Sequence, residues 1–244
     1  MPAPMNVRLK EPTESIPGWA IQGARWLALN QQAGGNPDFY PLTVKAAYVV
    51  GVIHDICSSV SVLLQVPPAT VRATYIPAYG VYAAGVELLG RCVRGVNDTS
   101  NSHASLLTGF KWLCSSSYET VDRTHQLIQT SNGPYDIETL AQLRHFAAHG
   151  QASASPGSAI HGLPNVDTEI LSQMPALIAD GLERWWNDLQ RGDRSETLCN
   201  RLAKANVIAF RNWPVFNAWT LFERDARGNY RSMTELFLEF DWKV

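Results

Sequence analysis

The stretch from Val44 to Val66 is the most apolar part of the chain, and it constrains the fold more than any other segment. Its length is close to that of a membrane span. However, His54 and Asp55 stand at its centre, serines occupy positions 58, 59 and 61, and no basic segment flanks it. Its apolar residues recur at helical spacing, at Ile53, Ile56, Val60 and Leu63. These features predict a buried central helix of a bundle and no membrane partner.

Helical periodicity also dominates the rest of the chain. Further helices are expected over residues 70–95, 104–130 (with a possible break at the serines 115–117), 135–150, 166–190 and 194–205. Turns are expected at 131–134 and 225–229, a strand at 215–223, and a last short helix to Phe240 that begins with a capping box of Ser232 and Glu235. The fold class is therefore all-α: an antiparallel helical bundle over 44–192, with an irregular arm over 1–43 and a small α/β appendage over 193–244.

Composition limits the kinds of partner that the chain can bind. With 244 residues, 45% of them hydrophobic, the chain can bury a sizeable core, and its net charge of −2 gives no global attraction to nucleic acid. Six basic and six acidic residues balance each other between Val66 and Gly150, which leaves room only for a small, focused basic site. The four cysteines form no CxxC pair, and the N-terminus does not resemble a signal peptide. We therefore expect reduced, buried thiols and a cytoplasmic location.

The segment from Tyr135 to Gly150 carries the most informative polar residues. Asp136 can cap the start of a helix here, and Gly150 can end it. Arg144, His145 and His149 do not fit a plain packing role, and the two histidines are four residues apart, so they share one helix face. An arginine beside an imidazole is a plausible pair for handling a phosphate group. A solvated helix face is the simpler alternative.

The residues Arg-His-Phe-Ala-Ala-His at 144–149, preceded by Leu140 and Leu143 and followed by Gly150, resemble the signature helix of the HEPN superfamily. That signature is an arginine, a polar residue, three further residues and a histidine. The resemblance covers about residues 45–190 and implies a helical bundle that commonly forms a homodimer, here through the motif helix. Many HEPN domains are metal-independent endoribonucleases, whereas others only bind RNA or nucleotides.

The resemblance implies RNA as the partner and cleavage by the RNA's own 2′-hydroxyl, without a cofactor or metal. His149 would transfer protons near neutral pH, Arg144 would bind the phosphate, and His145 would orient His149 or hold RNA. The product would be a 2′,3′-cyclic phosphate. Arg91 and Arg94, near the end of the helix over 70–95, are weaker candidates for RNA binding, and Glu87 forms an i,i+4 pair with Arg91. By family analogy the chain would be a toxin or defence protein, with an antitoxin or another regulator as a further partner.

Two other functions are also compatible with the sequence. His145 and His149 have the HxxxH spacing with which a helix binds zinc, and a third ligand would have to come from His54, Asp55, His103 or His161. Alternatively, the bundle is a non-catalytic module for RNA or nucleotide binding or for dimerisation, which the balanced charge favours. A cysteine hydrolase built on His54 and Cys57 has little support, because that stretch is expected to be buried.

Overall fold

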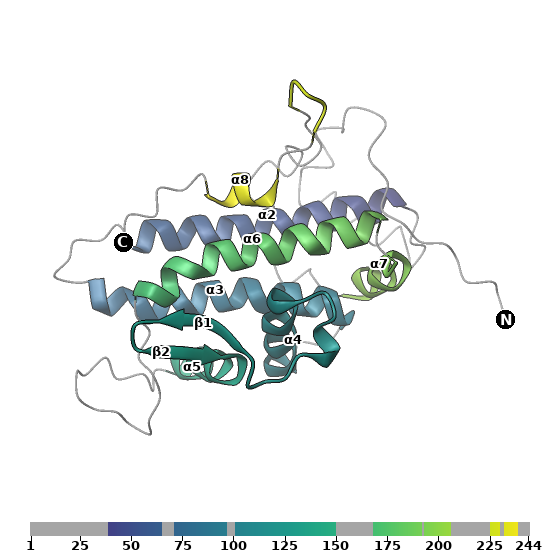
Figure 1. Ribbon diagram of the computed structural model, residues 1–244. Helices are drawn as coiled ribbons and strands as arrows, with labels where there is room; N and C mark the ends of the chain where they lie inside the picture. Colours follow the sequence, from purple (N-terminus) through teal and green to yellow (C-terminus); the bar gives the residue numbers. More distant parts are fainter. Residues whose placement is uncertain are drawn as a thin grey trace.

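The computed structural model describes residues 39–64, 71–96, 101–149, 168–191, 193–205, 225–229 and 232–238. These residues are mostly helical and contain one small antiparallel sheet of two strands (Figure 1). The predicted helical character of the chain is thus confirmed. Residues 1–38 of the arm predicted over 1–43, residues 150–167 and the strand predicted over 215–223 lie outside the described residues, whereas residues 39–43 of the predicted arm are helical.

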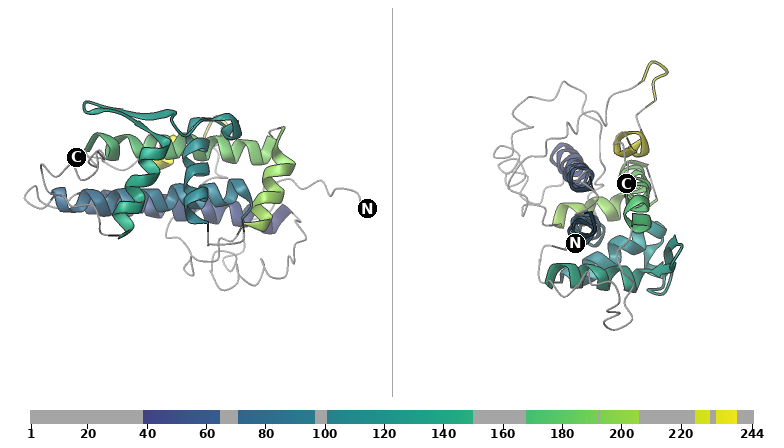
Figure 2. Two further views of the ribbon diagram at one scale, coloured as in Figure 1. Left: turned by 90° about the horizontal axis from the view of Figure 1, so that it is seen from below. Right: turned by 90° about the vertical axis from the view of Figure 1, so that its left-hand side faces the viewer.

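Three long helices form the body of the molecule: α2 (Phe39–Leu64), α3 (Val71–Arg94) and α6 (Thr168–Arg191). They lie side by side, and α4 (Ser102–Cys114) and α5 (Ile137–His149) cross α3 at a steep angle on the side away from α2 (Figures 1 and 2). The short helix α7 (Ser195–Lys204) packs against α3 and α6, and α8 (Met233–Leu238) packs against α6. The capping box predicted for α8 is confirmed, because Ser232 and Glu235 exchange two side chain–backbone hydrogen bonds of 2.9 and 3.1 Å.

The most apolar stretch of the chain lies in α2, which begins at Phe39, five residues earlier than the expected start at Val44. Pro41 stands in its first turn, where a missing N–H costs nothing. Among the described residues, α2 is the one helix whose length and composition would suffice to cross a membrane. Its buried residues, which include Ile53 and Val60, belong to the common core, and this packing accounts for its apolar sequence.

The helix predicted over 104–130 is wrong beyond Cys114, where α4 ends. The hydroxyl of Ser115 accepts a hydrogen bond of 3.1 Å from the N–H of Ser117, in competition with helical bonding. A 3₁₀ turn (η2, Tyr118–Thr120) and the hairpin of β1 (Gln126–Thr130) and β2 (Gly133–Asp136) follow. The turn predicted at 131–134 is confirmed as the connection of this hairpin, and β2 runs directly into α5.

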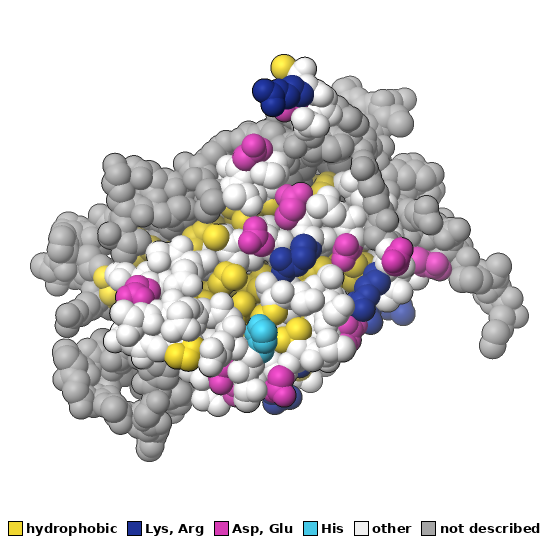
Figure 3. Space-filling model, in the orientation of Figure 1, with side chains coloured by type: hydrophobic (Ala, Val, Ile, Leu, Met, Phe, Trp, Pro, Cys, Tyr) yellow, Lys and Arg dark blue, Asp and Glu magenta, His cyan; other side chains and the backbone are white. Residues whose placement is uncertain are grey.

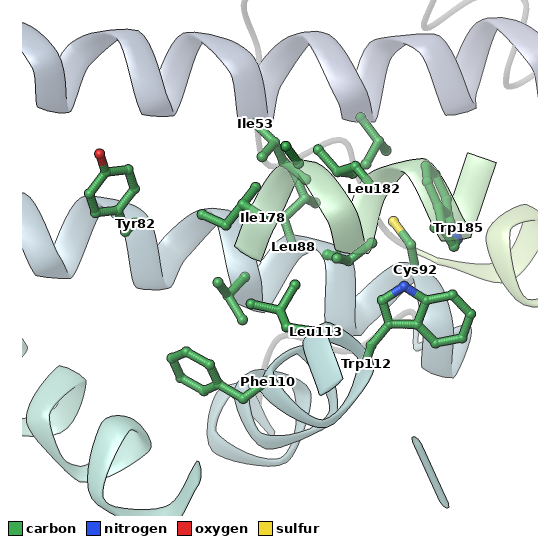
Figure 4. Packing of buried hydrophobic residues seen from close by; sticks show 14 of the residues in the cluster. Ile53, Tyr82, Leu88, Cys92, Phe110, Trp112, Leu113, Ile178, Leu182 and Trp185 are labelled. Atoms are coloured by element: carbon green, nitrogen blue, oxygen red, sulfur yellow. The ribbon is translucent and has the colours of Figure 1, made fainter. Parts of the chain in front are cut away.

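Helices α3 and α4 approach each other through glycines. A Cβ atom on Gly90 would lie 1.8 Å from the backbone oxygen of Ser105, and one on Gly109 would lie 2.1 Å from that of Val86. Either side chain would overlap the backbone of the other helix, so glycine is required at both positions. Phe110, Trp112 and Leu113 of α4 then reach the core beside Ile178 and Leu182 of α6 (Figure 4), where the indole N–H of Trp112 donates to the carbonyl of Gly181 at 2.9 Å.

Candidate functional site

Helix α5 carries the predicted site, and local sequence signals form it. The carboxylate of Asp136 accepts a hydrogen bond of 2.7 Å from the N–H of Thr139, so the predicted N-cap is confirmed. Ile137, Leu140, Ala141 and Leu143 are buried, as the apolar stripe requires. The hydroxyl of Tyr79 in α3 donates to the carbonyl of Leu140 at 2.6 Å and fixes α5 against α3.

Arg144 is directed from α5 toward α3 and α4. Its Nη2 atom donates to Oε2 of Glu87 at 3.1 Å and lies 3.4 Å from the hydroxyl of Ser102. The Arg144 side chain is 30% exposed, so it is anchored in the protein and still accessible to solvent. Arg144 is therefore held in one orientation, unlike an arginine on a free helix face.

Glu87 is the residue whose role the sequence did not reveal. It is buried in the middle of α3, and its two oxygens contact different arginines: Oε1 pairs with Arg91 on the same helix and Oε2 pairs with Arg144 on α5. The spacing of Glu87 and Arg91 predicts their pair, which is confirmed. The contact with Arg144 spans 57 positions of the sequence, so no local pattern could have indicated it.

A second arginine–serine contact lies beside the first. Arg94, in the last turn of α3, donates to the hydroxyl of Ser105 at 3.0 Å, and Ser102 and Ser105 are one turn apart at the start of α4. We call the set of Arg91, Arg94, Arg144, Glu87, Ser102 and Ser105 the arginine cluster. It combines three guanidinium groups with one carboxylate and lies near the N-terminus of α4, where the helix dipole adds positive potential. This arrangement favours the binding of an anion.

Of the two histidines of the motif, the structure describes the side chain of His145 only. His145 is exposed on α5, on the side away from the core. His149 is the last residue of α5, but its side chain lies outside the described residues, as does the chain from Gly150 to Asp167. The structure therefore unites Arg144 with the two weaker candidates, Arg91 and Arg94. It leaves the spatial relation between the His149 imidazole and Arg144 as a prediction.

Two of the residues named for a metal site, His54 and Asp55, lie apart from His145, whereas His103 is the second residue of α4. His54 and Asp55 lie on α2, where His54 contacts the carbonyl of Leu236 at 3.2 Å and the ring of Phe237 in α8. Helix α5 lies on the opposite side of α3 (Figures 1 and 2). Within the described ranges no three His, Cys, Asp or Glu residues are grouped to hold a metal ion. His161 falls outside those ranges.

The cysteines are free thiols in the core or at its edge. Cys57, Cys92 and Cys199 are buried as predicted, and Cys114 is half-buried. Burial raises the pKa of Cys92 to about 12 and that of Cys114 to about 11, and it raises the pKa of Cys57 further. Since only the thiolate is nucleophilic, the raised pKa values make Cys57, Cys92 and Cys114 poor nucleophiles near neutral pH.

The charged side chains on the face shown in Figure 3 are of both signs and are interspersed, which agrees with the balanced charge of the sequence. In comparisons with protein-family models, with curated proteins and with solved structures, the chain gives no significant match.

Proposed function

We propose that the protein is a HEPN-like, metal-independent endoribonuclease whose motif helix is α5. The observation that carries this proposal is the position of Arg144. In a helix whose sequence resembles the HEPN signature, it is fixed by Glu87 at 3.1 Å, beside Arg91, Arg94 and the start of α4. A half-exposed arginine within an excess of positive charge suits a bound phosphate. The helical surroundings of α5 also agree with a HEPN-like bundle.

Cleavage would follow the chemistry of RNA itself. The 2′-oxygen of a ribose attacks the adjacent phosphorus, the bond to the 5′-oxygen of the next nucleotide breaks, and a 2′,3′-cyclic phosphate and a 5′-hydroxyl end result. Arg144 stabilises the charge that develops on the non-bridging oxygens. His149 transfers a proton, and His145, exposed on the same helix, orients it or binds RNA.

In-line cleavage needs both a base for the 2′-hydroxyl and an acid for the leaving 5′-oxygen. We propose that a symmetric homodimer through α5 brings two copies of His149 together and supplies both groups. Size-exclusion chromatography with light scattering should then give twice the mass of one chain, and a monomer that cleaves RNA at full rate would refute this arrangement.

The test of the function is incubation of labelled single-stranded RNA and transfer RNA with the wild type and with His149→Ala and Arg144→Ala, all in EDTA. His125→Ala serves as the matched control, because His125 is an exposed histidine in the loop before β1. We expect the wild type and His125→Ala to leave cyclic phosphate ends and the other two variants to lose at least about 100-fold in rate.

Equal cleavage by wild type and His149→Ala would refute the catalytic assignment. Salt-dependent RNA binding without cleavage by any of these proteins would instead support the non-catalytic binding module.

A further inference from the structure

We propose that Glu87 is a positioning residue of this site: its carboxylate, held by Arg91, fixes the guanidinium of Arg144 through Nη2, so that the Nη1 and Nε donors can bind an RNA phosphate. This inference rests on the proposed function and deepens it, because it names the residue that gives Arg144 its orientation. Glu87 is not part of the sequence motif, because it lies in α3 and not in the motif helix α5.

The contacts of Arg144 are one-sided. Both use the same nitrogen, Nη2, which contacts Glu87 at 3.1 Å and Ser102 at 3.4 Å. The donors on Nη1 and Nε have no partner among the described residues. Because the guanidinium is planar and rigid, fixing one corner sets the direction of the others. Nη1 carries two N–H groups and Nε carries one, and each of them can donate to an oxygen of a phosphate group.

Arg91 has the complementary role of holding Glu87 in place. Its side chain is only 14% exposed, against 30% for Arg144, and it pairs with the oxygen of Glu87 that Arg144 does not use. One turn of α3 separates Glu87 from Arg91, so the helix itself fixes their distance. Both carboxylate oxygens are thus engaged with guanidinium groups, which suits Glu87 to positioning and not to proton transfer.

The test compares Glu87→Gln with Glu119→Gln. Glu119 is a matched control, since its carboxylate also contacts two arginines, Arg194 at 3.2 Å and Arg201 at 3.8 Å, but it lies in η2 and is 48% exposed. We expect Glu87→Gln to lower kcat about 10- to 100-fold through misplacement of Arg144. KM for RNA should stay unchanged or fall, because a negative charge is removed from a cationic site. Glu119→Gln should leave both constants unchanged.

A double-mutant cycle separates positioning from a general effect of charge. If Glu87 acts through Arg144, Glu87→Gln should change kcat in the wild-type background and have no further effect in Arg144→Ala. An equal fold-change in both backgrounds would overturn the proposal. If Glu87→Gln does not fold, Glu87→Asp takes its place. Its shorter side chain cannot reach both arginines, so full kcat in this variant would also overturn the proposal.

The same cycle can be measured without catalysis, with the Kd of a DNA oligonucleotide that lacks the 2′-hydroxyl. A wild type that cleaves no RNA would refute the proposed function alone. The positioning role would still stand if Glu87→Gln changed the Kd by a different factor in the protein that retains Arg144 than in Arg144→Ala, and it would fall if the factor were the same in both backgrounds.

Discussion

Replacement of Gly90 by alanine tests the crossing of α3 and α4, on which the arginine cluster is built. The new Cβ would lie 1.8 Å from the oxygen of Ser105 and 2.7 Å from the backbone nitrogen of Gly109. The first distance is about 1.6 Å shorter than the 3.4 Å at which ordinary van der Waals contact begins. Since the opposing atoms are backbone, no rotamer change can relieve the overlap, and α4 must move away from α3.

The expected cost follows from two opposing terms. Overpacking of a core costs about 1–3 kcal/mol, whereas replacing a glycine within a helix by alanine gains about 1 kcal/mol in helix propensity. Because this overlap involves backbone, we place the overpacking term at its upper end and expect a net loss of about 2 kcal/mol. For a chain of this size the loss corresponds to a fall in Tm of about 4–8 °C.

Thermal and urea denaturation followed by circular dichroism would measure this loss. Gly85→Ala is the matched control on the same helix, because a Cβ there would make its nearest contact, to Ile56, at an ordinary 3.4 Å. This control should be neutral or more stable by up to about 1 kcal/mol. If Gly90→Ala were as stable as the control, the close crossing of α3 and α4 would be wrong.

Two further predictions concern local contacts. Asp136→Ala removes the N-cap bond to Thr139 and should cost about 1 kcal/mol in urea denaturation, while Asp136→Asn should retain most of it; equal losses would contradict the cap. Burial lowers the pKa of Lys45 from 10.5 to about 8, although its ammonium donates to the carbonyl of Ala203 at 3.0 Å. The unfolded chain therefore binds more protons between these pH values, and the wild type should gain up to about 1.4 kcal/mol per pH unit over Lys45→Met from about pH 8 to 10.5. If the difference in free energy of unfolding between the wild type and Lys45→Met did not vary with pH, the lowered pKa of Lys45 would be refuted.

The features that could be predicted from the sequence are those set by contacts within a few residues. Apolar periodicity located α3 to within one residue at each end, and the Asp136 cap and the Ser232–Glu235 box located the starts of α5 and α8. The pair of Glu87 and Arg91 was predictable for the same reason, since a single helix fixes its spacing.

The hairpin was missed because the signal for it is not local. Val121 and Leu127 do pack against the core, as their apolar character predicts, but they reach it from a loop and a strand. An apolar residue every few positions satisfies a helix and an irregular path equally well. Which one forms depends on what the segment packs against, and here Gln173 of α6 donates to the carbonyl of Gln129 in β1 at 2.8 Å.

By itself, the sequence determined that the chain is mostly helical and that Arg144, His145 and His149 share one helix. Apolar periodicity and helix caps depend on residues close together in the sequence, so they can be recognised without knowledge of the fold. Only the tertiary structure decided that Arg144 meets Glu87, because this contact depends on two glycines that let α3 and α4 approach and on the hairpin that leads into α5. Such a contact joins residues far apart in the chain, and it stabilises the protein only after the helices have packed together.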